Sequence, residues 1–347
     1  MSLPVIRSLA DCTDIYKGVL PYVPQLYDFP QQIFQNINNA QALKVLYVST
    51  NPLTSAFAFS LFLAPIFLLV SEVNKNYSQV DRCWSLLPTI YNAHYVAYAH
   101  ATGLPTRRLD TLLLISAIWS TRLTYNYWRK GGYSVGSEDY RWEVLKEYIN
   151  APLFFVFNVV FISFAQSFLL FIITAPTYIL LLAAKNTAAS YPIGDLVFSR
   201  ALVGLVFLAF YADGQQWNFQ NAKKEYQKTA KVPEGYHQED LDRGFNVTGL
   251  FAYSRHPNFA AEQSVWVVLY AWSCWVTQSY YNWSGIGAAA YLILFQASTW
   301  FTEGISAKKY PEYKEYQRRV GMFLPKLPGG PPGDFSDKRA SKPATAK

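Results

Sequence analysis

Long apolar stretches without charge are the feature that most constrains the fold of this chain. Residues 53–70 are the clearest of them, since eighteen consecutive positions carry no charged side chain and match the hydrocarbon thickness of a bilayer. The predicted spans are residues 53–70, 84–100, 109–128, 152–173, 194–212, 258–278 and 284–302. We therefore predict an all-α, polytopic membrane helical bundle with about seven transmembrane helices.

The composition agrees with a membrane location. Charged residues are 15% of the chain and hydrophobic residues 51%, whereas soluble proteins carry about 25% charged residues. The 26 tyrosines and 10 tryptophans fit rings placed at lipid–water boundaries. The net charge of +7 comes mostly from residues between and after the apolar stretches. We interpret them as orientation signals or as contacts to phosphates, and we expect no nucleic-acid partner.

The basic residues also predict an orientation. Of the 30 Lys and Arg residues, 23 fall on the side that carries the carboxyl terminus, which places that terminus in the cytosol. We expect a lead-in without a span over 1–51, a membrane domain over 52–328 and a disordered tail over 329–347. The apolar residues 175–184 are too few to cross, so they form a re-entrant or interfacial piece or extend the preceding helix.

Polar side chains gather where the sixth span begins, in the sequence GLFAYSRHPNFAAEQSVW. Asn258, Glu262 and Trp266 are spaced by four, so they share one face if this segment is helical. Arg255 and His256 precede them. Ionisable groups at membrane depth are costly and suggest a function. The alternative is that Arg255 and His256 mark the membrane edge while Glu262 pairs with another helix.

Two further helix faces carry polar residues. Arg122, Asn126 and Arg129 are spaced as neighbours on one face, and two guanidinium groups with an amide suit an anion such as phosphate. They could equally pair with the acidic residues of 138–143. Asp213 lies on a face with Gln216 and Gln220, for which ligand contact and hydrogen bonding between helices are equally good interpretations.

Other chemistries have little support in the sequence. The three cysteines are far apart, the four histidines are scattered, and neither HExxH nor a glycine-rich phosphate-binding motif occurs. We therefore expect no metal and no soluble dinucleotide-binding domain.

Three motifs together resemble one family. They are SRHPNFAAE with a following Trp, EDYRW after a glycine-rich turn, and Glu303 followed by KKYPEYKEYQ and FLP. In this order they resemble the DUF1295 family of steroid 5α-reductase-like membrane proteins, over about residues 81–325. The resemblance implies a multi-helix membrane fold in the endoplasmic reticulum and NADPH-dependent reduction of a carbon–carbon double bond conjugated to a ketone, in a steroid-like or other hydrophobic substrate.

The resemblance carries over residue by residue, with departures. Asn258, Glu262 and Trp266 match the reductase pattern N-F-x-x-E-x-x-x-W, whose Asn and Glu bind the cofactor, and Trp119 stands where the reductases have a catalytic Tyr. The clusters described above add further predicted cofactor contacts. All these contacts lie in a carboxyl-terminal half over about 195–325 and on the third predicted span. They are Arg122, Asn126, Arg129, Asp213, Arg255, His256, Asn258, Glu262 and Trp266. The candidate acids are Tyr133, Tyr140 and Tyr253.

Two alternatives stay open. The Arg-His-Pro-x-aromatic motif is similar to that of isoprenylcysteine-type membrane methyltransferases, which use S-adenosylmethionine on a lipid or prenylated substrate. The segment GSEDYRW is what we associate with DUF1295 proteins and not with those enzymes. Trp119 suggests a further alternative, a non-catalytic lipid-binding membrane protein.

Overall fold

The computed structural model describes residues 2–187 and 191–326. Regular structure in these two ranges is helical apart from an isolated bridge between Ser254 and Gly321, which confirms the all-α prediction. The tail predicted over 329–347 lies outside the described residues. The chain divides into unit 1, Met1–Gly204 with Val265–Leu294, and unit 2, Leu205–Ser264 with Phe295–Lys347. Each unit is considered by itself.

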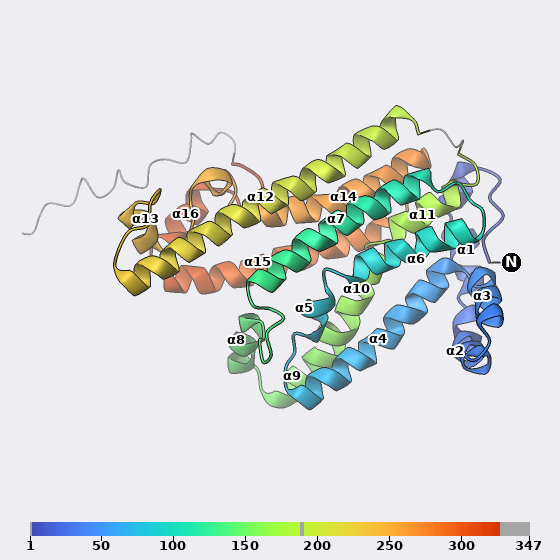
Figure 1. Ribbon diagram of the computed structural model, residues 1–347, viewed down its shortest axis with the longest axis horizontal. Helices are drawn as coiled ribbons and strands as arrows, with labels where there is room; N and C mark the ends of the chain where they lie inside the picture. Colours follow the sequence, from blue (N-terminus) through green and yellow to red (C-terminus); the bar gives the residue numbers. More distant parts are fainter. Residues whose placement is uncertain (1, 188–190, 327–347) are drawn as a thin grey trace, which may run out of the picture. The chain divides into compact units, whose positions relative to one another are not determined.

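Most of the helices belong to unit 1 (Figure 1). They are α1 (Ile15–Gly18), α2 (Gln25–Asn36), α3 (Ala40–Ser49), α4 (Pro52–Asn74), α5 (Gln79–Cys83), α6 (Leu87–Ala101), α7 (Arg107–Arg129), α8 (Tyr140–Tyr148), α9 (Ala151–Phe157), the π-helical segment Asn158–Ala165, α10 (Gln166–Ile172) and α11 (Ala175–Ala183). Three helices contribute residues to both units, namely α12 (Ile193–Thr229), α14 (Pro257–Val276) and α15 (Gly285–Lys309). Unit 2 adds α13 (Gln238–Arg243) and α16 (Tyr313–Arg319).

Three helical stretches have the length and composition to cross a membrane: Pro52–Asn74, Ala151–Ala183 and Ile193–Thr229. They support a membrane protein. The other predicted spans coincide with α6, α7, α14 and α15, and the count of seven stays a prediction. Helix α4 begins at Pro52 because the Asn51 side chain accepts hydrogen bonds from the backbone N–H groups of Leu53 and Thr54, and because proline at the first position sacrifices no hydrogen bond.

The short apolar piece predicted over 175–184 is an internal helix of unit 1. All nine residues of α11 are buried. Its polar side chains bond within the unit, since Thr177 Oγ1 donates to Asn92 Oδ1 at 2.7 Å and Tyr178 Oη donates to the Gly18 carbonyl at 2.7 Å. The helix is separate from α10 because residues 173–174 form a turn before Pro176. Protein atoms, and not lipid, therefore surround this piece.

A buried ion pair joins α7, α12 and α14 within unit 1. The Asp195 carboxylate is fully buried and accepts two hydrogen bonds from the Arg108 guanidinium, at 2.9 and 2.8 Å. The Trp272 indole N–H donates to the same carboxylate at 2.7 Å. A buried carboxylate held by a bidentate arginine and a third donor is satisfied as long as every partner stays in place.

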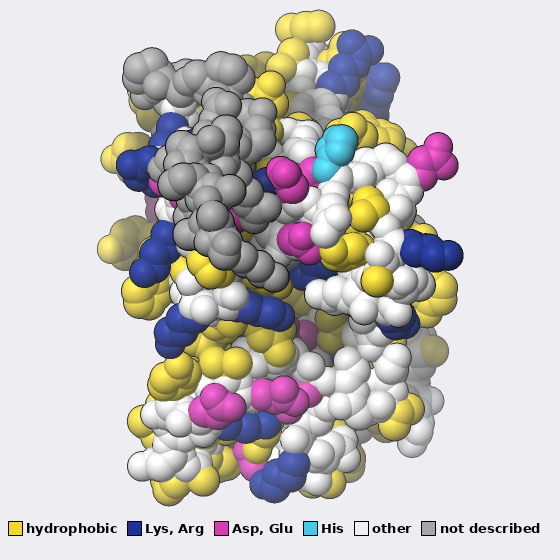
Figure 2. Space-filling model, turned by 90° about the vertical axis from the view of Figure 1, so that its left-hand side faces the viewer, with side chains coloured by type: hydrophobic (Ala, Val, Ile, Leu, Met, Phe, Trp, Pro, Cys, Tyr) yellow, Lys and Arg dark blue, Asp and Glu magenta, His cyan; other side chains and the backbone are white. Residues whose placement is uncertain are grey.

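Unit 2 is built on aromatic packing. One cluster gathers Phe245, Tyr313, Tyr316 and Val320, and the other gathers Phe219, Ala222 and Leu241. Tyr316 is almost fully buried and its hydroxyl donates to the Phe251 carbonyl, so this aromatic cluster fixes the loop that precedes α14. On the face drawn in Figure 2, Lys, Arg, Asp and Glu side chains are interspersed with apolar ones.

Candidate functional site

The loop before α14 needs glycine at Gly249. This residue has φ +61°, in the left-handed region that favours glycine. A Cβ there would lie 2.2 Å from Gln215 Nε2 on α12, and the neighbouring Leu250 N–H donates to Gln215 Oε1 at 3.0 Å. The close approach of this loop to α12 therefore fixes the position of the residues that lead into α14.

Residues 254–256 are held by the segment that follows α16. The backbone N–H groups of Arg255 and His256 donate to the carbonyls of Gly321 and Met322, at 2.9 and 3.0 Å. Helix α14 then starts at Pro257, a favourable first position for proline. Asn258, Glu262 and Trp266 thus lie on a helix, as the spacing predicts.

Two acidic residues and an amide come together inside unit 2. Asn258 Nδ2 of α14 donates to Asp213 Oδ1 of α12 at 3.0 Å. Asp213 is 4% exposed, and Glu262, one turn after Asn258, is 5% exposed. The predicted contacts Asp213, Asn258 and Glu262 therefore belong to one unit, and the first two touch directly.

Unit 2 also contains buried polar atoms with no hydrogen-bond partner among the described residues. They are Gln216 Oε1 on α12 and Thr299 Oγ1 on α15. Gln216 follows Asp213 by three residues, which puts both on one helix face. Thr299 is fully buried. Leaving such groups unsatisfied costs about 1–3 kcal/mol each, so a bound polar ligand would relieve a real penalty.

Arg255 and His256 converge on Glu303 of α15. The Arg255 guanidinium donates to both carboxylate oxygens at 2.6 and 2.9 Å and to the carbonyls of Gln317 and Val320. His256 Nε2 lies 2.9 Å from Glu303 Oε1. Burial alone would raise the pKa of Glu303, but the hydrogen bonds from His256, Arg255 and Gln317 lower it to about 2.

Glu303 was part of a sequence motif, but its pairing with Arg255 and His256 was not predicted. Its partners are 47 and 48 residues away along the chain, and no local spacing connects them. The sequence signals at Glu303 were its place directly after a predicted apolar span and at the start of the motif that continues with KKYPEYKEYQ, and neither identifies a partner. Arg255 stays a predicted phosphate contact, but in this structure it donates its hydrogen bonds to Glu303 and two backbone carbonyls.

Lys223 of α12 is a buried basic residue of unit 2 that is not among the contacts predicted from the sequence. Its side-chain nitrogen donates to the Gly244 carbonyl at 2.8 Å and to Tyr310 Oη at 3.1 Å. Burial alone would raise the pKa of Tyr310, but the hydrogen bond and charge of Lys223 and the charge of Lys309 lower it. Neither of these acceptors is a carboxylate, so Lys223 is a further candidate contact for an anion.

The polar face of α7 belongs to unit 1. Arg122 and Asn126 are buried, and Arg129 donates to Asn126 Oδ1 at 3.0 and 2.7 Å. This contact follows from the shared face that the sequence predicts. Two of the acidic residues considered as alternative partners of these arginines form ion pairs with other residues. Glu138 pairs with Lys146, and Asp139 pairs with Arg141.

The candidate acids lie in different surroundings. Tyr133 Oη donates to the Arg82 carbonyl of α5 at 3.0 Å. Tyr140 and Tyr253 are 52% and 59% exposed. The GSEDYRW segment is bonded to α5, since Trp142 donates to Asp81 at 3.1 Å and Arg82 donates to the Ser137 carbonyl at 2.6 Å. This is a structural role that the family association did not predict.

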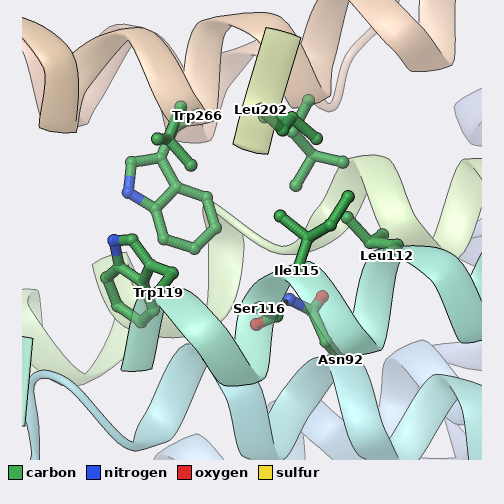
Figure 3. A pocket seen from close by; sticks show the side chains of 9 residues that line it. Asn92, Leu112, Ile115, Ser116, Trp119, Leu202 and Trp266 are labelled. Carbon is green, nitrogen blue, oxygen red and sulfur yellow. Dashed lines mark hydrogen bonds between the residues drawn. The ribbon is translucent and has the colours of Figure 1, made fainter. Parts of the chain in front are cut away.

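A small cavity inside unit 1 contains Trp119 and Trp266 (Figure 3). Their rings meet edge to face, with centroids 5.2 Å apart. Asn92 and Ser116 form the polar side, where Asn92 Nδ2 donates to Ser116 Oγ at 3.0 Å. The cavity measures about 20 Å³, which is room for about one water molecule. Within the described residues the Trp266 indole N–H has no hydrogen-bond partner.

A family model described as "Protein of unknown function (DUF1295)" matches residues 67–320. The uncharacterized protein C594.04c of Schizosaccharomyces pombe is 36% identical over 330 residues, which cover 94% of this chain and 94% of that protein. No solved structure matches this chain. Over residues 2–187 and 191–326, no group of three His, Cys, Asp or Glu side chains is placed to hold a metal ion.

Proposed function

Because the chain belongs to the DUF1295 family, the steroid 5α-reductase-like family, we propose that it is an integral membrane oxidoreductase. In this proposal NADPH is the reductant, and the substrate is a lipidic enone, steroid-like or related, that enters from the bilayer. The product is the corresponding saturated ketone. The family alone leaves the activity open, since one fold hosts many functions.

The buried Asp213–Asn258 contact with Glu262 nearby carries the proposal. Two carboxylates and an amide inside apolar helices are costly to bury, and such groups mark sites of function in membrane proteins. The Ser264 hydroxyl on the same helix has an ordinary structural role, because it donates to the Ala260 carbonyl of its own helix. Hydroxyl and amide donors of a ligand suit carboxylates, which only accept hydrogen bonds.

The residues of unit 2 fit the nicotinamide half of NADPH. Carboxylates such as Asp213 and Glu262 accept hydrogen bonds from ribose hydroxyls. Asn258 uses its NH₂ group on Asp213, which leaves its carbonyl oxygen to accept from a carboxamide. Gln216 Oε1 is a further acceptor, and Thr299 Oγ1 can donate or accept. The bound cofactor would supply a hydride, and these side chains would bind and orient it.

Unit 2 also fits the phosphate groups. Lys223 donates its hydrogen bonds to a backbone carbonyl and a tyrosine hydroxyl, so a phosphate at this side chain would not compete with a carboxylate for these bonds. Arg255 is held by Glu303, which is its counter-charge, so as a proposed phosphate contact it would have to share its guanidinium between that carboxylate and the phosphate. Arg122 and Arg129 remain proposed contacts on α7. Hydride would add to the β-carbon of the enone, and the acid that donates a proton to the carbonyl oxygen or the α-carbon would be Tyr133, Tyr140 or Tyr253.

One observation favours a second candidate, a non-catalytic lipid-binding protein. The cavity next to Trp119 and Trp266 is far smaller than a steroid, and Trp119 has no acidic proton to match the tyrosine of the reductases. In the reductase proposal the two indole rings separate when substrate enters. In the lipid-binding proposal they stay closed and no cofactor binds. An S-adenosylmethionine-dependent methyltransferase is the third candidate.

The proposal includes a location. We propose a multi-pass protein of the endoplasmic reticulum, the location that the family resemblance implies. We propose that its carboxyl terminus lies in the cytosol, because most Lys and Arg residues fall on that side. The cofactor would then bind from the cytosol.

Replacing Glu262 by Gln is expected to weaken NADPH binding about tenfold or more. The variant keeps the shape but removes a charge-assisted hydrogen bond, which contributes about 1.5–3 kcal/mol. The measurement is a titration of purified protein in nanodiscs, followed by NADPH fluorescence. Ser264→Ala is the matched control on the same helix and should bind as the parent does. Equal affinity of Glu262→Gln and the parent protein would remove Glu262 from the site.

A further inference from the structure

Helix α2 carries an apolar stripe that the protein covers only in part. Residues spaced by three and four along α2 and its ends form the stripe. They are Val23, Leu26, Tyr27, Pro30, Ile33, Phe34 and Ile37. None of the residues of α2 is buried, and Tyr27, Phe34 and Ile37 are 82%, 78% and 60% exposed. Two large aromatic rings and an isoleucine on one face thus have no protein covering in unit 1.

The structure places this helix at the start of a membrane span. The Asn51 backbone N–H donates to Gln25 Oε1 at 2.9 Å, and Thr54 Oγ1 donates to the Tyr22 carbonyl at 3.3 Å. These bonds tie the beginning of α2 to the first turn of α4, a stretch able to cross a membrane. Figure 1 shows α2 and α3 at that amino-terminal end of α4. Helix α2 therefore lies where α4 meets the polar boundary of the bilayer.

The length and the charge of α2 decide whether it crosses the bilayer or lies along its surface. Its 12 residues rise about 18 Å, which is less than the hydrocarbon core of about 30 Å, so it cannot cross. Only Asp28 and Lys44 are charged between residues 25 and 49. The side of α2 opposite the stripe carries uncharged polar residues such as Gln32. A short amphipathic helix of this kind lies in the plane of the interface.

We propose that α2 is an interfacial membrane helix whose Tyr27, Phe34 and Ile37 side chains insert at the boundary between headgroups and acyl chains. The occupant of the stripe is lipid because apolar surface is also exposed along the neighbouring part of α4, where Leu61 is 43% and Phe62 is 63% exposed. Aromatic rings at this depth suit the interface. The inference is independent of any cofactor or activity.

The test measures the depth of nitroxide labels in the full-length protein in phosphatidylcholine nanodiscs. Cys12 and Cys274 are buried, so Cys83→Ser alone gives a background of low labelling. Labels are placed at Phe34→Cys and at Gln32→Cys, the matched control on the polar side of the same helix. Tyr27→Cys is the second site on the stripe if Phe34→Cys does not fold. Collisions with oxygen, which concentrates in lipid, are compared with collisions with a water-soluble nickel chelate.

The label at position 34 is expected to meet oxygen at least threefold more readily, relative to nickel, than the label at position 32. Equal ratios at the two positions would overturn the proposal, because both sides of α2 would then lie in the same medium. Spin–spin broadening at position 34 that disappears on dilution with unlabelled protein would also overturn it, since a second copy of the chain would then cover the stripe.

Discussion

Replacing Glu303 by Ala is expected to destabilise unit 2 by about 3–5 kcal/mol and to lower its melting temperature by roughly 10 °C. Glu303 is 3% exposed and accepts from Arg255, His256 and Gln317. Removing it leaves the Arg255 guanidinium buried without its counter-charge, which is the costly half of breaking a buried ion pair. Thermal unfolding in detergent, followed by circular dichroism, measures the change.

Glu315→Ala is the matched control for this prediction. Glu315 also pairs with arginines, Arg318 and Arg319, but on the surface of a short helix where such pairs contribute about 0–1 kcal/mol. The two variants remove the same side chain from different environments. Similar melting temperatures for both would mean that the Glu303 cluster does not hold unit 2 together.

The same carboxylate predicts a pH dependence with a defined sign. Its pKa is about 2 in the folded protein, below the ordinary value of 4.5, so its stabilisation is fully present above pH 4.5. That stabilisation is lost as the pH falls from 4.5 toward 2. Between pH 5 and pH 3, the melting temperature of the parent protein should therefore fall more than that of Glu303→Gln. Parallel curves for the two proteins would contradict the low pKa.

Replacing Asp195 by Ala is expected to destabilise unit 1 by a similar amount, about 3–5 kcal/mol. Asp195 is fully buried, and both Arg108 and the Trp272 indole N–H depend on it. The variant strands a buried guanidinium and a buried N–H donor at once, while three helices lose their common contact. The measurement is again the melting temperature in detergent, with limited proteolysis to locate the loosened helices.

Asp110→Ala provides the comparison for unit 1. Asp110 lies close to Arg108 in the sequence and pairs with His100, but both side chains of that pair are about half exposed. We expect a change of about 0–1 kcal/mol from this variant. If Asp195→Ala melted at the same temperature as Asp110→Ala, the buried pair would not be a main support of the unit.

Periodic patterns in the sequence predicted the helices well, because length and apolar character are local properties. The uncharged residues 53–70 fall within α4, and the spacing of Asn258, Glu262 and Trp266 falls on α14. The prediction was vaguer at residues 175–184, where composition alone does not distinguish lipid from a protein interior. Their burial depends on contacts with distant parts of the chain. The Tyr178 hydroxyl, for example, donates to the carbonyl of Gly18, which is 160 residues away.

The candidate site was predictable in its parts and not in its pairings. Local spacing identified Asp213 and Asn258 separately, but their contact joins residues 45 positions apart. The role of Glu303 as the partner of Arg255 was out of reach for the same reason. Helix periodicity could not predict that the Thr299 hydroxyl lacks a hydrogen-bond partner among the described residues, because a threonine within an apolar helix normally bonds to its own backbone.

The central claim is that buried carboxylates and amides of unit 2 bind a nicotinamide nucleotide. The most direct test is equilibrium binding of the purified protein in nanodiscs to NADPH, NADH and S-adenosylmethionine, each titrated separately by calorimetry. We predict saturable binding of NADPH and none of S-adenosylmethionine. Binding of S-adenosylmethionine alone, or of none of the three, would contradict the account.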